Sequence, residues 1–281
     1  MDILTEAQKL HVGRAVADAG ERCLMPYFGR LATTDVAYKN SPDDPVSVAD
    51  KKSEAFLKEA LHDVLPHAHF IGEESFAQDA SILDLLRGDD VPTWVCDPLD
   101  GTLNFVAGKE GFGILLCLVS KGETQAAWLY DAYNKKMTLY DEKYGTTPAF
   151  PSVANGVAMR RPLFGLMGRK VFRHPETQRI AETLEGITLA PSEVPSVISY
   201  PMLFSGELDF LVFRTTFPWD HLPGLAIAKN LGLPYARWNG EAFRCDDVTH
   251  GLLIARNAET YREVRQTLIL SLMEAGVLNE K

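Results

Sequence analysis

The sequence predicts a protein of mixed α and β structure, with one large domain or two moderate ones. Its 281 residues are 46% hydrophobic, which is enough for a sizeable core, and disorder is not expected. Apolar residues recur at helical spacing near both ends of the chain, at about 5–24 and 258–275. Between them, short apolar runs such as 94–96 and 112–119 are typical of buried strands.

The first third of the chain predicts two helices separated by a loop. Thr5 and Gln8 have the spacing of a capping box, and an apolar helical stripe follows them. Residues 38–45 are rich in turn formers and indicate a loop. Ser47 and Asp50 repeat the capping-box spacing, so a second helix is expected to begin there.

Strands are expected on both sides of residues 93–105. Residues 69–71 predict a short strand that ends at Glu73 and Glu74, and the runs 112–119 and 124–130 predict a hairpin.

A change in composition predicts a subdomain boundary. Residues 146–157 are rich in Thr, Pro, Ser, Gly and Asn, so we divide the chain into 1–148 and 149–281. Beyond this boundary lie several basic residues in an otherwise acidic chain: Arg160, Arg161, Arg169, Lys170 and Arg173. They are either a solvated face or subunit contact, or a site for a second anionic group of a substrate.

The second part of the chain again mixes both kinds of element. We expect a helix at 175–184, strands at 196–200 and 210–213, a helix that opens at Trp219, and a closing helix at 258–275.

Net charge excludes one class of function. The chain has 28 Lys and Arg residues against 38 Asp and Glu residues, so its net charge is 28 − 38 = −10. Nucleic-acid-binding proteins usually carry a basic surface, so no nucleic-acid partner is expected. An anionic substrate would also be repelled unless bound cations reverse the local field.

The cysteines and the N-terminus indicate the compartment. The four cysteines form no Cys-x-x-Cys pair, so neither a zinc ribbon nor a redox motif is expected. The first residues lack the basic start and apolar stretch of a signal peptide, and no apolar run approaches the roughly 20 residues that span a bilayer. We therefore expect a soluble, cytoplasmic protein without a membrane partner.

The most informative stretch is residues 93–105. An apolar strand signature at 94–96 passes directly into Asp97 and Asp100, and a Gly-Thr pair follows. Carboxylates at the C-terminal end of a buried strand are a common way to hold a metal ion on a rigid edge. An Asp-Gly hairpin turn is the alternative, but a simple turn requires neither the first Asp nor the Thr.

Four short segments resemble, in order, the sequence boxes of the inositol monophosphatase family, which comprises Mg²⁺-dependent, lithium-sensitive phosphatases. Residues 97–102 match Asp-Pro-Ile/Leu-Asp-Gly/Ser-Thr. The other three are Val46–Asp50 (Val-Thr-x-Ala-Asp in the family), Ile71–Ser75 (the Glu-Glu box) and Trp219–Gly224 (Trp-Asp-x-x-Ala-Gly). The resemblance extends from about residue 39 to residue 224.

This resemblance implies the fold class, α+β / α/β, as a layered α-β-α-β-α sandwich of the inositol monophosphatase or sugar phosphatase type. Residues 1–148 would form an α+β subdomain with most of the metal ligands, and residues 149–281 an α/β subdomain that contributes Asp220. The resemblance also implies a homodimer.

The resemblance further implies two or three Mg²⁺ ions per site. Glu73, Asp97 and the Leu99 carbonyl would hold the first, and Asp97, Asp100 and Asp220 the second. These carboxylates would repel one another without cations, whereas Mg²⁺ prefers such oxygen ligands.

Catalytic and substrate-binding roles follow from the same resemblance. Asp50 would orient Thr102 and, through it, a water activated by the metal, and Glu73 belongs to this catalytic set. The backbone N–H groups of Gly101 and Thr102 would cradle the phosphate.

Lys39 and Asp220 complete the substrate and phosphate contacts that the resemblance implies. From the residues alone, Asp50 could instead be a carboxylate that favours a helix start, Asp220 a helix N-cap, and Lys39 a solvated loop lysine.

The expected function is a Mg²⁺-dependent phosphomonoesterase for a small polyol or sugar phosphate similar to inositol 1-phosphate. Phe213 stands where family members that act on inositol phosphate carry an acid, and Val194–Val197 replaces a Gly-Ser/Thr-Ala-Ala segment of the substrate pocket. Alternatives are a 3′(2′),5′-bisphosphate nucleotidase, a fructose-1,6-bisphosphatase, a histidinol phosphatase, or a catalytically silent relative that binds a metabolite.

Overall fold

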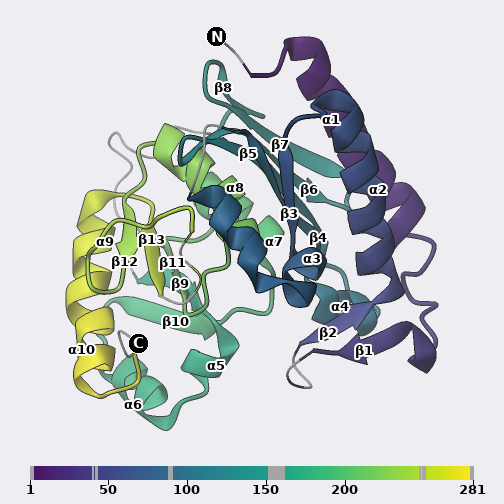
Figure 1. Cartoon of the computed structure of the whole chain (residues 1–281). Coiled ribbons are helices and arrows are strands. Elements are labelled where there is room, and N and C mark those ends of the chain that lie inside the picture. Colours follow the sequence, from purple (N-terminus) through teal and green to yellow (C-terminus); the bar gives the residue numbers. More distant parts are fainter. Residues whose placement is uncertain are drawn as a thin grey trace. The chain divides into compact units, whose positions relative to one another are not determined.

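The computed structural model describes residues 3–39, 41, 44–87, 91–150, 162–246, 248 and 251–278. Contacts divide the chain into two compact units, which are described separately (Figure 1). The first unit contains Met1–Pro148, Val194–Ile198 and Trp219–Ala226, and the second contains Ala149–Glu193, Ser199–Pro218 and Ile227–Lys281. By its contacts, Asp220 therefore groups with the first unit.

The first unit is built on a six-stranded sheet in the order β3-β4-β5-β6-β7-β8. The strands are β3 (His69–Gly72), β4 (Thr93–Asp100), β5 (Gly113–Ser120), β6 (Glu123–Asp131), β7 (Lys136–Asp141) and β8 (Gly145–Thr147). Only β3 and β4 pair in parallel, and the other neighbours in this sheet are antiparallel. The predicted hairpin is confirmed as β5–β6. Its turn places Lys121 and Gly122 at φ values of 53° and 76°, as in a type I′ turn, whose twist suits a hairpin.

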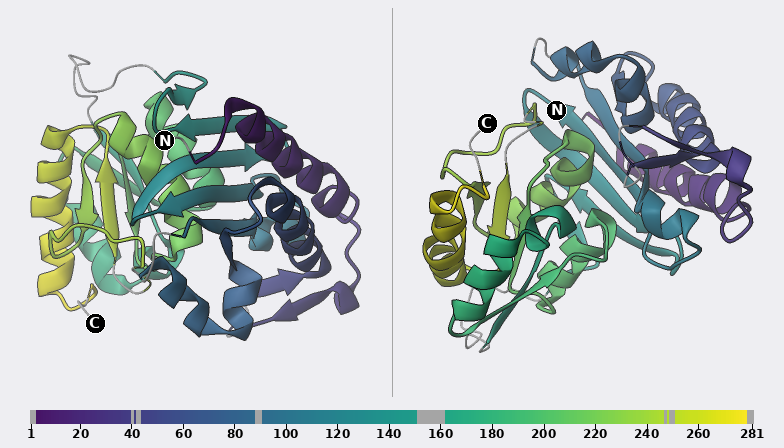
Figure 2. Two further views of the ribbon diagram at one scale, coloured as in Figure 1. Left: turned by 45° about the horizontal axis from the view of Figure 1, so that its top comes forward. Right: turned by 90° about the horizontal axis from the view of Figure 1, so that it is seen from below.

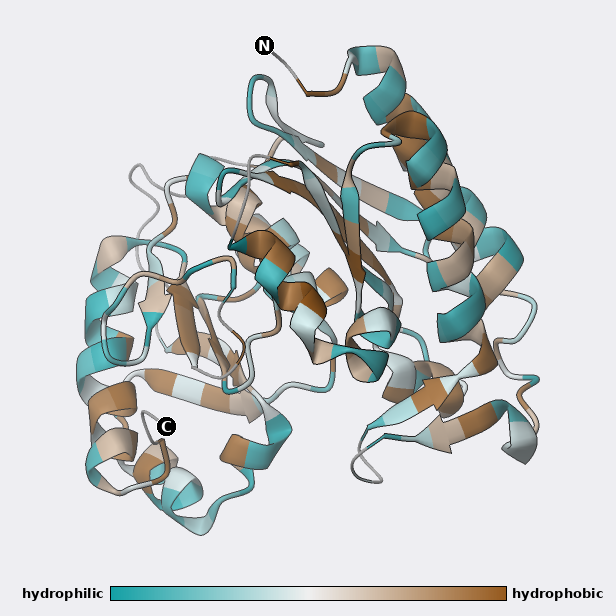
Figure 3. Cartoon of the chain, in the orientation of Figure 1, coloured by the Kyte–Doolittle hydropathy of each residue, from teal (hydrophilic) through white to brown (hydrophobic). Residues whose placement is uncertain are grey.

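Two long helices cover one face of this sheet (Figure 2). They are α1 (Glu6–Ala19), which η1 (Gly20–Leu24) continues, and α2 (Val48–Val64). Both predicted capping boxes are present, at Thr5 and at Ser47. Both helices carry hydrophilic and hydrophobic patches in Figure 3, and their apolar residues pack with Trp94 and Trp128 of the sheet in one hydrophobic core.

Short elements complete the first unit and carry much of the site. The two-stranded sheet pairs β1 (Val36–Tyr38) with β2 (Pro45–Ser47). The remaining elements are η2 (Thr33–Asp35), α3 (Glu73–Gln78), η3 (Ala80–Leu86) and α4 (Thr102–Val106).

The second unit contains a five-stranded sheet in the order β10-β9-β11-β13-β12. Its strands are β9 (Leu163–Met167), β10 (Ile187–Pro191), β11 (Phe210–Phe213), β12 (Tyr235–Arg237) and β13 (Leu252–Ala255). Strand β9 pairs in parallel with β10 and β11, and β13 pairs antiparallel with β11 and β12. The helical elements packed against the sheet are α5 (Arg169–Phe172), α6 (Pro175–Thr183), α9 (Ala258–Val264), η4 (Arg265–Ile269) and α10 (Leu270–Glu274).

Helices α7 (Ser196–Ser205) and α8 (Pro218–Asn230) contain residues of both units. The strand predicted at 196–200 is wrong, because this segment is the first half of α7. The helix buries four apolar side chains, Val197, Tyr200, Leu203 and Phe204. This burial outweighs the β propensity of the Val-Ile pair. Arg160 and Arg161 lie outside the described residues, whereas Arg169 and Lys170 form the start of α5.

No helix within the described residues is long and apolar enough to cross a membrane.

A buried ion pair joins strands of the second unit. Arg256 Nη1 lies 2.7 Å from Asp209 Oδ1, and the two side chains are 5% and 0% exposed. Asp209 Oδ2 also accepts the backbone N–H of Phe164 at 2.7 Å. The aspartate therefore links the start of β9 to the residue that follows β13.

We predict that Arg256→Met destabilises the protein by about 3–5 kcal/mol, because it leaves the Asp209 carboxylate buried without its partner charge. Urea unfolding followed by tryptophan fluorescence measures the effect. Arg262→Met, at an exposed arginine of α9, is the control. Equal unfolding midpoints for the two variants would contradict the prediction.

Candidate metal centre

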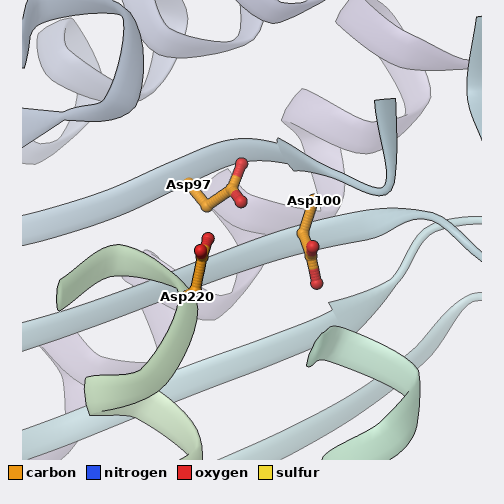
Figure 4. Close-up of side chains that lie close together, drawn as sticks. All are labelled: Asp97, Asp100 and Asp220. Atoms are coloured by element: carbon orange, nitrogen blue, oxygen red, sulfur yellow. The ribbon is translucent and has the colours of Figure 1, made fainter. Parts of the chain in front are cut away.

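Three aspartates from distant parts of the sequence meet in the first unit. Asp97 and Asp100 lie on β4, and Asp220 lies in the first turn of α8. One carboxylate oxygen of each residue lies within 4.8 Å of the other two (Figure 4). The structure thus brings together the three residues that the sequence analysis assigned to the second metal ion.

The backbone between Asp97 and Asp100 departs from a regular strand. The register of β4 against β5 shifts between these two residues. Asp97 Oδ1 accepts the backbone N–H of Leu99 at 3.0 Å, and the Pro98 carbonyl accepts Ser53 Oγ at 2.8 Å. These bonds hold the irregular end of β4, where both carboxylates emerge.

The cluster is electrostatically unfavourable without added positive charge. Burial, followed by repulsion from neighbouring carboxylates, raises the pKa of Asp97 and of Asp220 well above the usual range. Burial also raises the pKa of Asp100 to about 7, although the backbone N–H groups of Val197, Gly101 and Ser196 favour its ionised form. The three side chains offer only oxygen ligands, so a hard divalent cation such as Mg²⁺ fits this site.

Asp100 also anchors the start of α7. Its Oδ2 accepts the backbone N–H of Val197 at 2.6 Å. The N-terminus of a helix favours an adjacent negative charge, so this bond stabilises both groups. The end of the segment Val194–Val197 is therefore held at Asp100.

Glu73 and Lys39 lie next to the cluster. Lys39 Nζ is 2.8 Å from Glu73 Oε1 and 2.6 Å from Glu74 Oε1. Burial would lower the pKa of Lys39, but the two carboxylates outweigh it and raise that pKa above its usual value. Glu73 is not part of the group of three aspartates, yet its negative charge raises the pKa of each of them.

Asp50 and Thr102 are in direct contact. Asp50 Oδ2 accepts the backbone N–H of Ser47 at 2.8 Å and Ser47 Oγ at 2.6 Å, and its Oδ1 lies 3.0 Å from Thr102 Oγ1. Asp50 thus caps α2 and holds Thr102 at the same time. The Thr102 hydroxyl also lies 2.9 Å from the Leu99 carbonyl oxygen, so its single proton has two alternative acceptors.

Gly101 must be glycine for two reasons. Its φ of 89° is in the left-handed region, and a Cβ there would lie 2.7 Å from the Gly111 carbonyl oxygen and 2.9 Å from Pro195 Cγ. This turn leads from β4 into the first turn of α4 at Thr102.

Sequence analysis missed two residues that contact the site. Ser53 and Glu54 are buried on α2, and they bond to the Pro98 carbonyl and to the start of α3. The sequence does contain a sign of their role: polar residues stand three and four positions after Asp50, on a helix face whose other inward residues are apolar.

We predict that Mg²⁺ stabilises this protein increasingly as pH rises. In the metal-free protein, Asp100 has a folded pKa of about 7 against an ordinary value of 3.8, so the folded state holds more protons and its stability falls as pH rises through that window. Mg²⁺ requires the ionised carboxylates. Melting temperatures with Mg²⁺ and with chelator should therefore differ more at pH 8 than at pH 5, and equal differences would contradict the prediction.

Comparison with known proteins places the chain in a family. The profile of the Inositol monophosphatase family matches residues 6–275. An inositol-1-monophosphatase of Bacillus subtilis is 23% identical over 81% of this chain and 84% of its own length. A fructose-1,6-bisphosphatase/inositol-1-monophosphatase of Thermotoga maritima is 28% identical over 74% of this chain and 77% of its own length.

Solved structures share the fold. The structure of a Thermotoga maritima IMPase matches with a TM-score of 0.76 and 20% identity over 96% of this chain and 99% of that one. An IMPase/NADP phosphatase complexed with Mg²⁺ and phosphate matches with a TM-score of 0.69 and 16% identity over 88% of each chain. The predicted layered α/β fold class is confirmed by these matches. Since the family profile covers nearly the whole sequence, the chain belongs to the inositol monophosphatase family, a family of phosphoric monoester hydrolases.

Proposed function

We propose that this protein is a Mg²⁺-dependent phosphomonoesterase that acts on a small polyol or sugar phosphate. The observation that carries the proposal is the convergence of Asp97, Asp100 and Asp220 beside the Gly101–Thr102 turn. Lys39 is bonded to Glu73 and Glu74, and its charge favours the ionised form of Asp220 without offsetting the burial and repulsion that raise the pKa of that aspartate. Membership of the family supports the same activity.

The residues that would hold Mg²⁺ are Asp97, Asp100 and Asp220, together with Glu73 and the Leu99 carbonyl. Mg²⁺ bound there would attract the phosphate and lower the pKa of a water molecule at the site. A related structure is described as complexed with Mg²⁺ and phosphate, which supports this choice of ion. Two or three ions per site is our expectation from the family boxes.

The proton pathway runs through Thr102 and Asp50. Of the two acceptors within reach of the Thr102 hydroxyl, Asp50 Oδ1 would receive its proton, and the lone pairs of Thr102 Oγ1 would then be available to a water molecule. Burial raises the pKa of Asp50 to about 7, which suits a group that holds a proton near neutral pH. In this proposal, Asp50 orients Thr102 and takes the proton that Thr102 relays.

The phosphate would be bound by the start of α4 and by the charges around it. The backbone N–H groups of Gly101 and Thr102 lie at a turn into a helix, where amides favour an anion. Lys39 would add positive charge beside the phosphate, and Asp220, which would help to hold Mg²⁺, would also contact the substrate. Glu73 would be a catalytic residue as well as a metal ligand.

The substrate class rests on the relatives and on the two departures from the family pattern, Phe213 and Val194–Val197. Phe213 provides an aromatic ring stacked on Tyr200, with ring centroids 5.7 Å apart, where an acid would bind hydroxyl groups. A sugar bisphosphate is therefore the second candidate, since one relative is named as a fructose-1,6-bisphosphatase as well.

We also propose that the protein works in the cytoplasm as a homodimer. Four free cysteines, three of them buried, support a reducing compartment. The homodimer rests on the family resemblance alone.

Phosphate release from a panel of esters tests the proposed function. The panel contains inositol 1-phosphate, fructose 1,6-bisphosphate, histidinol phosphate and 3′-phosphoadenosine 5′-phosphate, each with Mg²⁺ and with chelator. We expect hydrolysis only with Mg²⁺, and a loss of about 100-fold or more in Asp97→Asn, because a metal ligand is removed. Asp84→Asn, at a side chain that is 70% exposed, is the control.

Two outcomes of the panel would reject parts of the proposal. No turnover of any ester by folded protein would favour the silent-relative alternative. A strong preference for the bisphosphate nucleotide would replace the sugar or polyol substrate.

We predict different effects for two replacements of Thr102. Thr102→Val should lower kcat by about 100-fold or more, because the hydroxyl that links Asp50 to the water is lost. Thr102→Ser keeps the hydroxyl and should stay within about tenfold of the wild type. Steady-state kinetics at saturating Mg²⁺ measure both, and equal kcat values for Val and Ser variants would contradict the relay.

A further inference from the structure

The inner face of α2 carries three buried polar side chains next to the metal centre. Asp50, Ser53 and Glu54 follow one another at i, i+3 and i+4, so they share one face of the helix. Each binds a different segment: Asp50 binds Thr102, Ser53 binds the Pro98 carbonyl, and Glu54 binds the start of α3. A single helix thereby sets the positions of three segments of the site.

Glu54 caps α3 from a distance. Its Oε2 accepts the backbone N–H of Glu74 at 2.8 Å, and its Oε1 accepts the backbone N–H of Ser75 at 2.9 Å as well as Ser75 Oγ. The residue at the N-cap position is Gly72, which has no side chain to serve as a cap. A Cβ at Gly72 would overlap the Glu54 carboxylate, so the absence of a side chain there leaves room for Glu54.

Capping α3 with the buried Glu54 costs more free energy than capping it with a local residue, so we expect a further role of this side chain in the site. Glu54 is only 6% exposed, and burying a carboxylate is unfavourable until hydrogen bonds satisfy it. A Ser or Asp at position 72 could cap α3 locally at lower cost. Unlike a local cap, the Glu54 carboxylate connects α3 to α2, the helix that carries Asp50.

The first residues of α3 are the ones that matter for the metal centre. Glu73 is a proposed ligand, and Glu74 holds Lys39 at 2.6 Å. The bonds from Glu54 fix the backbone at Glu74 and Ser75, and therefore the direction in which the Glu73 carboxylate projects. Phe76 of α3 also packs on Trp219, with ring centroids 5.0 Å apart, next to Asp220.

We propose that Glu54 is a positioning residue of the metal centre, which holds α3 so that Glu73 is preorganised to bind the cation. This inference rests on the proposed Mg²⁺ site but not on the identity of the substrate. Glu54 bonds to the two residues after Glu73 rather than to Glu73 itself, and outer groups that orient metal ligands typically contribute 10–100-fold to metal affinity or activity.

The chemistry of the carboxylate makes Glu54→Gln a sharp test. Three donors point at the two oxygens of Glu54, and an ionised carboxylate only accepts hydrogen bonds. Glutamine has the same shape, but its NH₂ group would face one of the backbone N–H donors. The start of α3 must then shift away, and Glu73 moves with it.

The experiment measures Mg²⁺ binding by isothermal titration calorimetry and phosphate release as a function of Mg²⁺. We expect Glu54→Gln to weaken Mg²⁺ binding by about 10–100-fold. The kcat at saturating Mg²⁺ should change much less, because the cation restores the position of Glu73. Glu59→Gln, at an exposed glutamate of the same helix, is the matched control and should bind Mg²⁺ like the wild type.

A purely structural role predicts a different result: a lower melting temperature with unchanged Mg²⁺ affinity of the folded protein. That result would overturn the inference. If Glu54→Gln does not fold, Ser75→Ala removes one donor only and should weaken Mg²⁺ binding by about three- to tenfold. Wild-type affinity in Ser75→Ala would then overturn it.

The outcomes separate this inference from the proposed function. Wild-type protein that binds Mg²⁺ but hydrolyses no ester rejects the proposed phosphatase, while the comparison of Mg²⁺ affinities still decides the role of Glu54. Wild-type protein that does not bind Mg²⁺ overturns both.

Discussion

Repulsion among buried carboxylates is the constraint on which the first unit depends. Asp97, Asp100 and Asp220 lie within a few ångströms of one another, and burial together with repulsion from neighbouring carboxylates, Glu73 among them, raises their pKa values. A fold that only needed stability would avoid this cluster, because unpaired buried charges are unfavourable. The arrangement becomes favourable when a divalent cation supplies the opposite charge. The same cation would let a protein of net charge −10 accept an anionic substrate.

The surrounding structure restrains the carboxylates through hydrogen bonds rather than through packing alone. Strand β4 delivers two of them at an irregular end, where Ser53 holds the Pro98 carbonyl. Side chains on one face of helix α2, Asp50 and Glu54, hold Thr102 and the start of α3. Asp100 itself bonds to the first turn of α7, so a proposed metal ligand also serves as a structural link. Preorganisation of this kind keeps the ligands in place before a cation binds.

Local signals in the sequence predicted much of this structure. The spacing at Ser47 and Asp50 predicted a helix start, and the apolar run before Asp97 predicted the strand that carries it, because caps and strands are encoded within a few residues. The segment 196–200 was predicted as a strand and is helical, since burial of its apolar side chains outweighs propensity. The polar spacing from Asp50 to Glu54 was visible in the sequence, but the role of Glu54 was not, because its partners Glu74 and Ser75 are brought to it only by the fold. The proximity of Asp220 to Asp97 was expected only from the resemblance, as no local pattern connects two such distant residues.

Anomalous diffraction from a crystal soaked in Mn²⁺ tests the central claim most directly. Mn²⁺ takes the same oxygen ligands as Mg²⁺ and gives an anomalous signal that locates it. The account predicts a peak within coordination distance of carboxylate oxygens of Asp97, Asp100 and Asp220, which disappears in Asp97→Asn. A fully soaked crystal with no peak at these residues, or with peaks only elsewhere, would contradict it.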